Sequence, residues 1–210
     1  MPIDKHIDPL KEMANDVRFL IEVLDLAPTH VVGHSLGGRL AQAIAERWPH
    51  LVRKIVLIST SAALRERRGW LWENIRMLRD PIDPESASIR EWCSGAVPID
   101  ENFLAHARRE SAAVPSRIWH SIYYEQLAYD PSPLLQDISA ATLILRGKED
   151  MIATEEHQIQ MKDAIVGAKF ISLPDHGHNI HWEAPERVVH LILTFLEASV
   201  TASGASSYSD

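Results

Sequence analysis

Residues 29–40 read THVVGHSLGGRL. A short β-branched run leads into Gly33, and the alanine-rich segment after Ser35, which ends at Trp48, has a helical pattern. A serine at a strand-to-helix turn can be held in a strained conformation that exposes its Oγ, and small residues at Gly33 and Gly37 let the neighbouring backbone pass close by. The G-x-S-x-G spacing therefore predicts a nucleophile at Ser35. The plainer alternative is a glycine-rich turn whose serine caps a helix.

Outward from this turn, helical patterns alternate with short apolar β-branched runs. Helices are predicted at 9–26, 36–48, 155–165 and 186–198, and strands at 29–32, 52–58, 141–145 and 169–173. Such alternation is typical of βαβ units and a parallel sheet. The first two strand runs are almost wholly apolar, which predicts strands covered on both faces.

Residues 60–135 have a different composition, with four of the six tryptophans and six prolines that divide the region into short helical pieces. We interpret this region as a helical insertion between two parts of one α/β unit, residues 1–59 and 136–199. Its helices are too short to form a core alone, so they are expected to lie on the sheet. The small polar tail, 200–210, is predicted to be disordered.

Composition narrows the class of protein. With 210 residues, 46% hydrophobic and 24% charged, the chain matches one globular domain. A net charge of −8 argues against nucleic acid or an anionic membrane as partner, and no apolar run is long enough to span a bilayer. The single Cys93 and a polar N-terminus unlike a signal peptide predict a cytoplasmic protein. The oligomeric state stays open.

A serine nucleophile needs a base, and the base needs a carboxylate to orient it. Of the 11 histidines, those in the stretch DHGHN, 175–179, follow the last predicted strand, and the stretch RGKED, 146–150, follows the strand before it. These stretches and Ser35 all lie after strands, and the carboxyl ends of parallel strands meet at one edge of a sheet. The spacing alone leaves the choice within each stretch open.

At these residues the chain resembles the α/β-hydrolase superfamily. The stretches LILRGKEDMI and GHNIHWEAPERV are similar to that family's acid and histidine segments, and the order serine, acid, histidine is the family's order. The resemblance implies a nucleophile at Ser35, an acid at Asp150 and a base at His178, with the Leu36 N–H as one oxyanion donor. It also implies an α/β fold with a mostly parallel sheet, flanking helices and a helical cap at 60–135.

The implied activity is hydrolysis of a carboxylic ester or lactone through an acyl-enzyme on Ser35. Such a reaction needs no cofactor and no metal, and its partner is a small-molecule substrate. Serine at this position argues against relatives with an aspartate nucleophile, such as haloalkane dehalogenases and epoxide hydrolases. The aromatic residues of the insertion are candidates either for the substrate pocket or for packing: Trp70, Trp92, Trp119 and Tyr123.

The chain departs from the family at its N-terminus. About four strands and a helix, on the order of 50–70 residues, precede the corresponding first helix in the family. The fold is therefore expected to be N-terminally incomplete and to lack a second oxyanion donor, whose loss typically costs ~10²–10³ in rate. The strand at 29–32 is then expected to form an exposed apolar edge. The expected causes are a late start of the reading frame, a split protein or a degenerate relative.

Two other interpretations remain. The chain can be a truncated or degenerate relative that keeps the triad residues but does not catalyse. Alternatively, His176, His178 and His181 resemble the H-x-H-x-D-H cluster of metallo-β-lactamases, with Ile180 where that motif has aspartate. Three histidines can supply the three protein ligands of a catalytic zinc.

Overall fold

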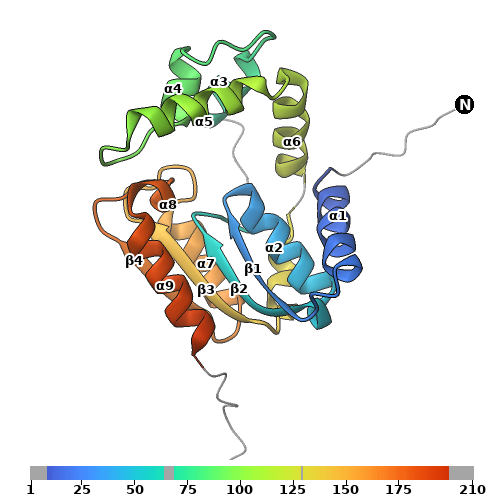
Figure 1. Ribbon diagram of the computed structural model, residues 1–210. Helices are drawn as coiled ribbons and strands as arrows, with labels where there is room; N and C mark the ends of the chain where they lie inside the picture. Colours follow the sequence, from blue (N-terminus) through green and yellow to red (C-terminus); the bar gives the residue numbers. More distant parts are fainter. Residues whose placement is uncertain (1–8, 64–68, 129, 199–210) are drawn as a thin grey trace, which may run out of the picture.

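The computed structural model describes residues 9–63, 69–128 and 130–198. Four parallel strands form one sheet in the order β1-β2-β3-β4. The strands are β1 (Thr29–His34), β2 (Val52–Ile58), β3 (Ala141–Gly147) and β4 (Lys169–Leu173). The helices beside the sheet are α1 (Pro9–Val23), α2 (Leu36–Arg47), α7 (Glu155–Ala164), α8 (Ile180–Glu183) and α9 (Pro185–Glu197), with 3-10 turns η1 (Pro49–Leu51) and η2 (Ser132–Asp137). The predicted α/β fold with a parallel sheet is confirmed (Figure 1).

Alternation along the strands sends side chains to two separate cores. Ile55, Leu57 and Ile144 pack with α1, α2 and α7 on one face of the sheet. Val56 and Leu145 point to the other face, where they pack against α8 and α9. Helices therefore lie on both faces, as the apolar run of β2 predicts.

Strand β1 does not have this cover. It is the edge strand of the sheet, and Val32 is 46% exposed although its register partner Val56 is fully buried. The buried cluster beneath α9 takes described residues from β2, β3 and β4 but none from β1. The prediction that both early strands are covered on both faces is thus right for β2 and wrong for β1, because α9 does not extend over the sheet edge.

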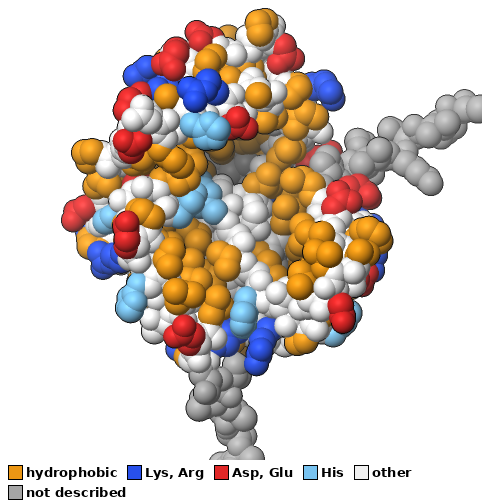
Figure 2. Space-filling view, in the orientation of Figure 1, with side chains coloured by type: hydrophobic (Ala, Val, Ile, Leu, Met, Phe, Trp, Pro, Cys, Tyr) orange, Lys and Arg blue, Asp and Glu red, His pale blue; other side chains and the backbone are white. Residues whose placement is uncertain are grey.

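Helix α1 continues this exposed apolar surface. Ala14 and Ile21 are buried against α2, but Phe19, Leu20 and Val23 are more than half exposed. The space-filling view shows hydrophobic side chains at the surface over α1 and the neighbouring part of the sheet (Figure 2). Only part of the apolar stripe predicted for residues 9–26 is therefore buried in the core.

A group of helices lies above the carboxyl ends of the strands (Figure 1). It consists of α3 (Trp70–Met77), α4 (Ala87–Trp92), α5 (Glu101–Ala113) and α6 (Ser116–Ala128). No strand occurs in the described residues between β2 and β3. We call residues 69–128 the helical segment.

The helical segment has a small core of its own, contrary to expectation. Leu78, Ile82, Ile89 and Cys93 form a buried cluster, against which Trp92 and other partly buried side chains pack. The expectation that these helices are too short to form a core is wrong, because tryptophans supply large apolar surfaces around the cluster. Trp182 of α8 packs on the same cluster, so the helical segment also lies against the α/β unit. The predicted limits of the insertion, 60–135, stay a prediction, and the tail at 200–210 lies outside the described residues.

Lys54 connects β2 to the end of α9. Its side chain is buried, and Nζ donates to the carbonyl oxygens of Phe195 at 2.8 Å and Leu196 at 2.9 Å, with Ala198 as a third acceptor. The last carbonyls of a helix have no intrahelical partner and carry negative partial charge. The ammonium therefore caps α9 from the sheet.

Among the described residues, no helix combines the length and apolar character needed to cross a membrane.

Replacing Lys54 with methionine should lower the free energy of unfolding by about 1–3 kcal/mol, because buried carbonyl acceptors lose their donor. Urea unfolding followed by circular dichroism measures this loss. The matched control is Arg53→Met on the neighbouring, exposed position, which should change stability by less than about 0.5 kcal/mol. Equal effects of the two variants would contradict the capping role.

Candidate active site

Ser35 lies at the turn between β1 and α2 with a left-handed backbone, φ 51° and ψ −116°. Its N–H donates to Ile58 O at 2.9 Å, and Thr60 Oγ1 donates to Ser35 O at 2.7 Å. Positive φ is unfavourable for a residue with a Cβ, so these bonds from the neighbouring strand maintain the strain. The side chain of Ser35 makes no capping bond to α2, which argues against the interpretation of Ser35 as a helix cap.

Space around the glycines explains part of the G-x-S-x-G pattern. A Cβ on Gly33 would lie 2.2 Å from Gly37 O, so only glycine fits there. A Cβ on Gly38 would meet the Thr60 side chain at 2.5 Å. A Cβ on Gly37 would meet nothing within 4 Å. The expectation that small residues two before and two after Ser35 permit close approach therefore holds for Gly33 but not for Gly37.

Two alanine variants test this difference with the same added methyl group. Gly33→Ala should destabilise the fold by about 3 kcal/mol or more, because the obstacle is rigid backbone. Gly37→Ala lies inside α2 and should range from neutral to about 1 kcal/mol stabilising. Urea unfolding compares the two, and equal losses would show that the turn does not depend on the close approach at Gly33.

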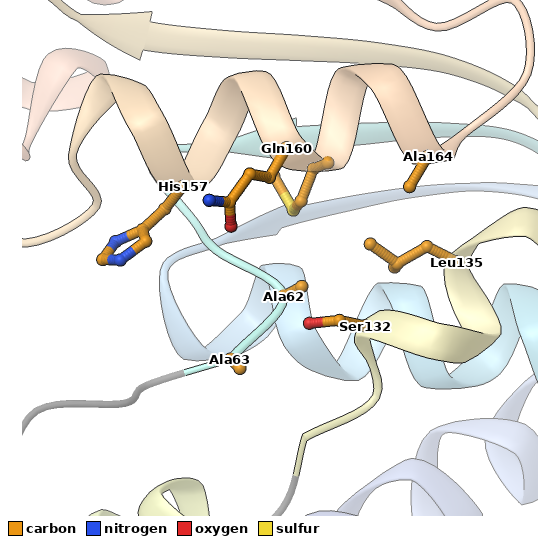
Figure 3. A pocket seen from close by; sticks show the side chains of 8 residues that line it. Ala62, Ala63, Ser132, Leu135, His157, Gln160 and Ala164 are labelled. Carbon is orange, nitrogen blue, oxygen red and sulfur yellow. The ribbon is translucent and has the colours of Figure 1, made fainter.

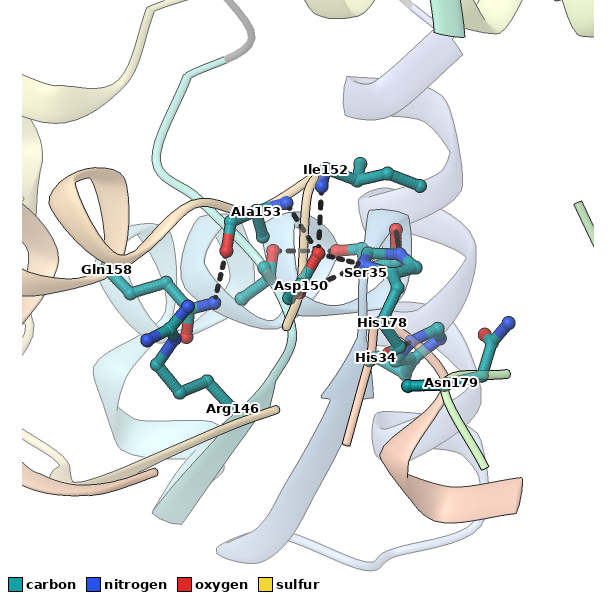
Figure 4. Close-up of polar contacts among 12 residues, drawn as sticks. His34, Ser35, Arg146, Asp150, Ile152, Ala153, Gln158, His178 and Asn179 are labelled. Atoms are coloured by element: carbon teal, nitrogen blue, oxygen red, sulfur yellow. Dashed lines mark hydrogen bonds and ion pairs between the residues drawn. The ribbon is translucent and has the colours of Figure 1, made fainter. Parts of the chain in front are cut away.

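Ser35, His178 and Asp150 form a continuous chain of hydrogen bonds (Figure 4). His178 Nδ1 lies 3.0 Å from both carboxylate oxygens of Asp150, and Nε2 lies 3.0 Å from Ser35 Oγ. A carboxylate can only accept, so Nδ1 carries the proton and Nε2 is free to accept from the serine hydroxyl. This is the tautomer that a general base needs.

The other candidates from the same two stretches lie elsewhere. Glu149 is exposed, and its backbone N–H donates to His176 O at 2.9 Å. The His176 ring contacts Pro174 O, and the His181 ring packs against His34. Of the residues in the two stretches, the structure brings Asp150 and His178 to Ser35.

Asp150 is itself fixed by a buried network. Its Oδ1 accepts from the backbone N–H groups of Ile152 and Ala153, each at 2.9 Å. Gln158, fully buried in α7, donates from Nε2 to Ala153 O at 2.7 Å and so supports the turn that holds Asp150 (Figure 4). Gln158 is not predictable from the sequence, since a glutamine in a helix carries no signal until its tertiary contact is known.

His34 is not predictable from the sequence either, because the G-x-S-x-G motif accepts any residue at its position. Its Nε2 donates to the backbone carbonyl of His178 at 3.0 Å, and its ring centroid is 4.1 Å from that of His181. Burial, helped by the nearby His178 and His181, lowers the pKa of His34 from 6.5 to about 3. Burial and His178 lower the pKa of His181 to about 4. Both rings are therefore neutral at neutral pH.

These two histidines predict acid sensitivity. Their folded pKa values lie below the unfolded value of 6.5, so the unfolded state binds more protons, and stability falls as pH drops from about 6.5 toward 4. For His34 the loss by pH 5 is about 2 kcal/mol. Urea unfolding at pH 7 and pH 5 measures it. The drop should shrink in His34→Gln, and an undiminished drop in that variant would contradict the assignment.

The zinc alternative finds no support in the geometry. Both ring nitrogens of His178 are hydrogen-bonded, one to Asp150 and the other to Ser35. The imidazoles of His176 and His181 make contacts with Pro174 and His34 instead. Throughout the described ranges, no three His, Cys, Asp or Glu side chains form a group that could hold a metal ion. The three histidines that resemble the metallo-β-lactamase cluster thus each contact a different partner.

The hydrogen-bonded chain opens into a large cavity between the helical segment and the sheet. Its volume is about 900 Å³, and Ser35, Leu36 and His178 lie in its wall. The four aromatic residues proposed from sequence also line it: Trp70, Trp92, Trp119 and Tyr123. The hollow is visible in the space-filling view (Figure 2). Trp92 and Trp119 belong to the helical core as well, so packing and cavity lining coincide in them.

Leu36 contributes an available backbone donor at this cavity. It is the first residue of α2, so its N–H has no partner within the helix. The helix N-terminus adds positive partial charge beside Ser35. An oxyanion forming on a substrate at Ser35 would meet both.

A second pocket is far smaller, about 60 Å³, and lies between α7, η2 and the segment after β2 (Figure 3). Ala62, Ser132 and Gln160 are among its lining residues. A space of this size admits little more than water. Of these two pockets, which the described residues form, the cavity at Ser35 has room for a substrate.

The family model described as "Alpha/beta hydrolase family" matches residues 3–191. The chain therefore belongs to the α/β-hydrolase family, as the resemblance of its motifs implied.

Individual relatives are more distant. BpoC of Mycobacterium tuberculosis, whose name describes a non-heme bromoperoxidase, is 27% identical over 205 residues, covering 90% of this chain and 76% of BpoC. The pyrrolizixenacetamide deacetylase of Xenorhabdus hominickii is 27% identical over 201 residues, covering 89% and 72%. A solved esterase from Exiguobacterium antarcticum superposes with a TM-score of 0.78 at 19% identity, covering 90% of this chain and 74% of the esterase. The last likeness concerns the fold alone.

Proposed function

We propose that this protein hydrolyses a carboxylic ester or lactone through an acyl-enzyme on Ser35. The observation that carries the proposal is the unbroken hydrogen-bonded chain from Ser35 Oγ through His178 to Asp150, open to a cavity of about 900 Å³. Ser35, Asp150 and His178 are then the catalytic residues, and the Leu36 N–H is an oxyanion donor.

In this proposal each group has one part in the reaction. His178 Nε2 takes the Ser35 hydroxyl proton while Oγ attacks the carbonyl carbon, and Asp150 stabilises the resulting imidazolium. The carbon–oxygen bond breaks as His178 gives that proton to the leaving alcohol. In a lactone the alcohol stays attached to the acyl group. A water, deprotonated by His178, then releases the acid and restores Ser35.

The cavity wall favours substrates with a bulky apolar part. Trp70, Trp92 and Trp119 present aromatic surface, and the volume exceeds what a short ester would fill. In this proposal the helical segment is the cap that shapes the substrate pocket. The name of one relative describes a deacetylase, and removal of an acetyl group supports acyl transfer to water as the reaction type.

Fluorophosphonate labelling followed by intact mass tests the proposal. A single adduct that maps to Ser35 is expected, because the probe reacts with serines activated by a base. His178→Ala should cut the labelling rate by at least ~100-fold. Circular dichroism on the same samples verifies that each chain is folded.

The matched control is Ser86→Ala, which removes a hydroxyl at the start of α4 and should leave labelling intact. Hydrolysis of a p-nitrophenyl ester should disappear in Ser35→Ala and persist in EDTA. Loss of activity in EDTA with retention in Ser35→Ala would end the serine mechanism. A folded chain with no adduct would instead favour the non-catalytic alternative.

A further inference from the structure

The segment that carries His178 is attached to the helical segment on both sides of the histidine. Asn179 is buried, and its Nδ2 donates to Ser94 O at 3.0 Å. Glu183 accepts from the Gly177 N–H through Oε2 at 2.8 Å and from the Ala96 N–H through Oε1 at 3.2 Å. Both neighbours of His178 in sequence are therefore bonded, directly or through Glu183, to residues 94–96. We call residues 92–96 the cap turn.

Packing at this junction is tight enough to transmit a displacement. A Cβ on Gly95 would lie 2.7 Å from Ile99 Cδ1 and 3.0 Å from Glu183 Cγ, and a Cβ on Gly177 would lie 3.1 Å from Glu183 Oε1. The Glu183 side chain thus fills the space between the two loops. A shift of the cap turn must move Glu183, Gly177 or both, since packed interiors do not deform smoothly.

The cap turn also borders the cavity. It begins at Trp92, whose ring packs edge-on against Trp119 at 5.1 Å, and both rings line the cavity beside Ser35. A ligand that fills the cavity therefore presses on the residues to which Asn179 and Glu183 are bonded. From the sheet side, His34 holds the carbonyl of His178.

We propose that Asn179 and Glu183 are positioning residues that align His178 with Ser35 according to the position of the cap turn. The helical segment then does more than shape the pocket, because the base is aligned when the cap turn is docked. This inference rests on the proposed function for its catalytic consequence. Both residues line the cavity, but their hydrogen bonds go to Ser94, Ala96 and Gly177 rather than to Ser35. A positioning role therefore predicts a larger effect on the chemical step than on substrate affinity.

The kinetic test compares Glu183→Ala, Glu183→Gln and the cap-side variant Gly95→Ala. With a p-nitrophenyl ester, kcat should fall by up to about 100-fold in Glu183→Ala, because small misplacements of a catalytic group are costly. Glu183→Gln keeps one acceptor oxygen and should lie between it and the wild type. Gly95→Ala should lower kcat although residue 95 is remote from His178 in sequence. Glu183 and Gly95 line the cavity themselves, so some change in KM is expected, but the change in kcat should exceed the change in KM in all three variants.

The matched control is Glu186→Gln, which removes the same charge from an exposed position three residues along the chain and should retain wild-type kcat. Urea midpoints are measured for every variant. Unchanged kcat in Glu183→Ala would overturn the proposal. A fall in kcat that merely follows a loss of folded protein would also overturn it, since Glu183 would then be only structural.

Amide hydrogen exchange tests the coupling without turnover. In Glu183→Ala, peptides covering 92–96 and 176–183 should exchange faster together, while peptides of α7 stay unchanged. Faster exchange in only one of the two peptides would overturn the proposal. If the wild-type chain failed to react with a fluorophosphonate, the proposed function would fall, and this measurement would still decide whether the two loops are coupled.

Discussion

The hydrogen bond from the Ser35 N–H to Ile58 O is the constraint on which the rest of the site depends. It joins the end of β1 to the end of β2 and holds the serine backbone in its left-handed conformation. Without it, the turn would relax toward an ordinary helix start and the hydroxyl would rotate away from His178. The close approach of Gly33 to the Gly37 carbonyl belongs to the same turn. A few local contacts therefore decide whether the sheet edge presents a nucleophile.

Support for the base and the acid comes from longer-range contacts. Asp150 is held by backbone N–H groups that Gln158 stabilises from α7, and His178 is held by His34 from β1 and by the loop contacts of Asn179 and Glu183. Each triad member thus takes its orientation from a different element. Such mutual support makes the geometry of the proposed catalytic residues a property of the whole sheet edge rather than of any one loop.

The parts of this structure that are predictable from sequence are those set by local patterns. Period and turn residues place the strands and helices, and the G-x-S-x-G spacing places Ser35 at a strained turn. Contacts between distant segments escape this reasoning. The need for glycine at Gly38 depends on Thr60, and the exposure of Val32 depends on how far α9 reaches. Gln158, Asn179 and Glu183 look ordinary until the fold brings them to the residues that they hold.

The separate core of the helical segment has an evolutionary consequence. Its buried cluster shares no described residue with the two clusters that flank the sheet. Substitutions in the part of the cavity wall that the helical segment supplies can therefore accumulate without disturbing the network around Asp150, and they can change which molecules the cavity accepts. The junction at Glu183 sets the limit of this freedom. Lineages that diversify the segment are expected to preserve the backbone course of 94–96, even where the surrounding aromatic residues are replaced.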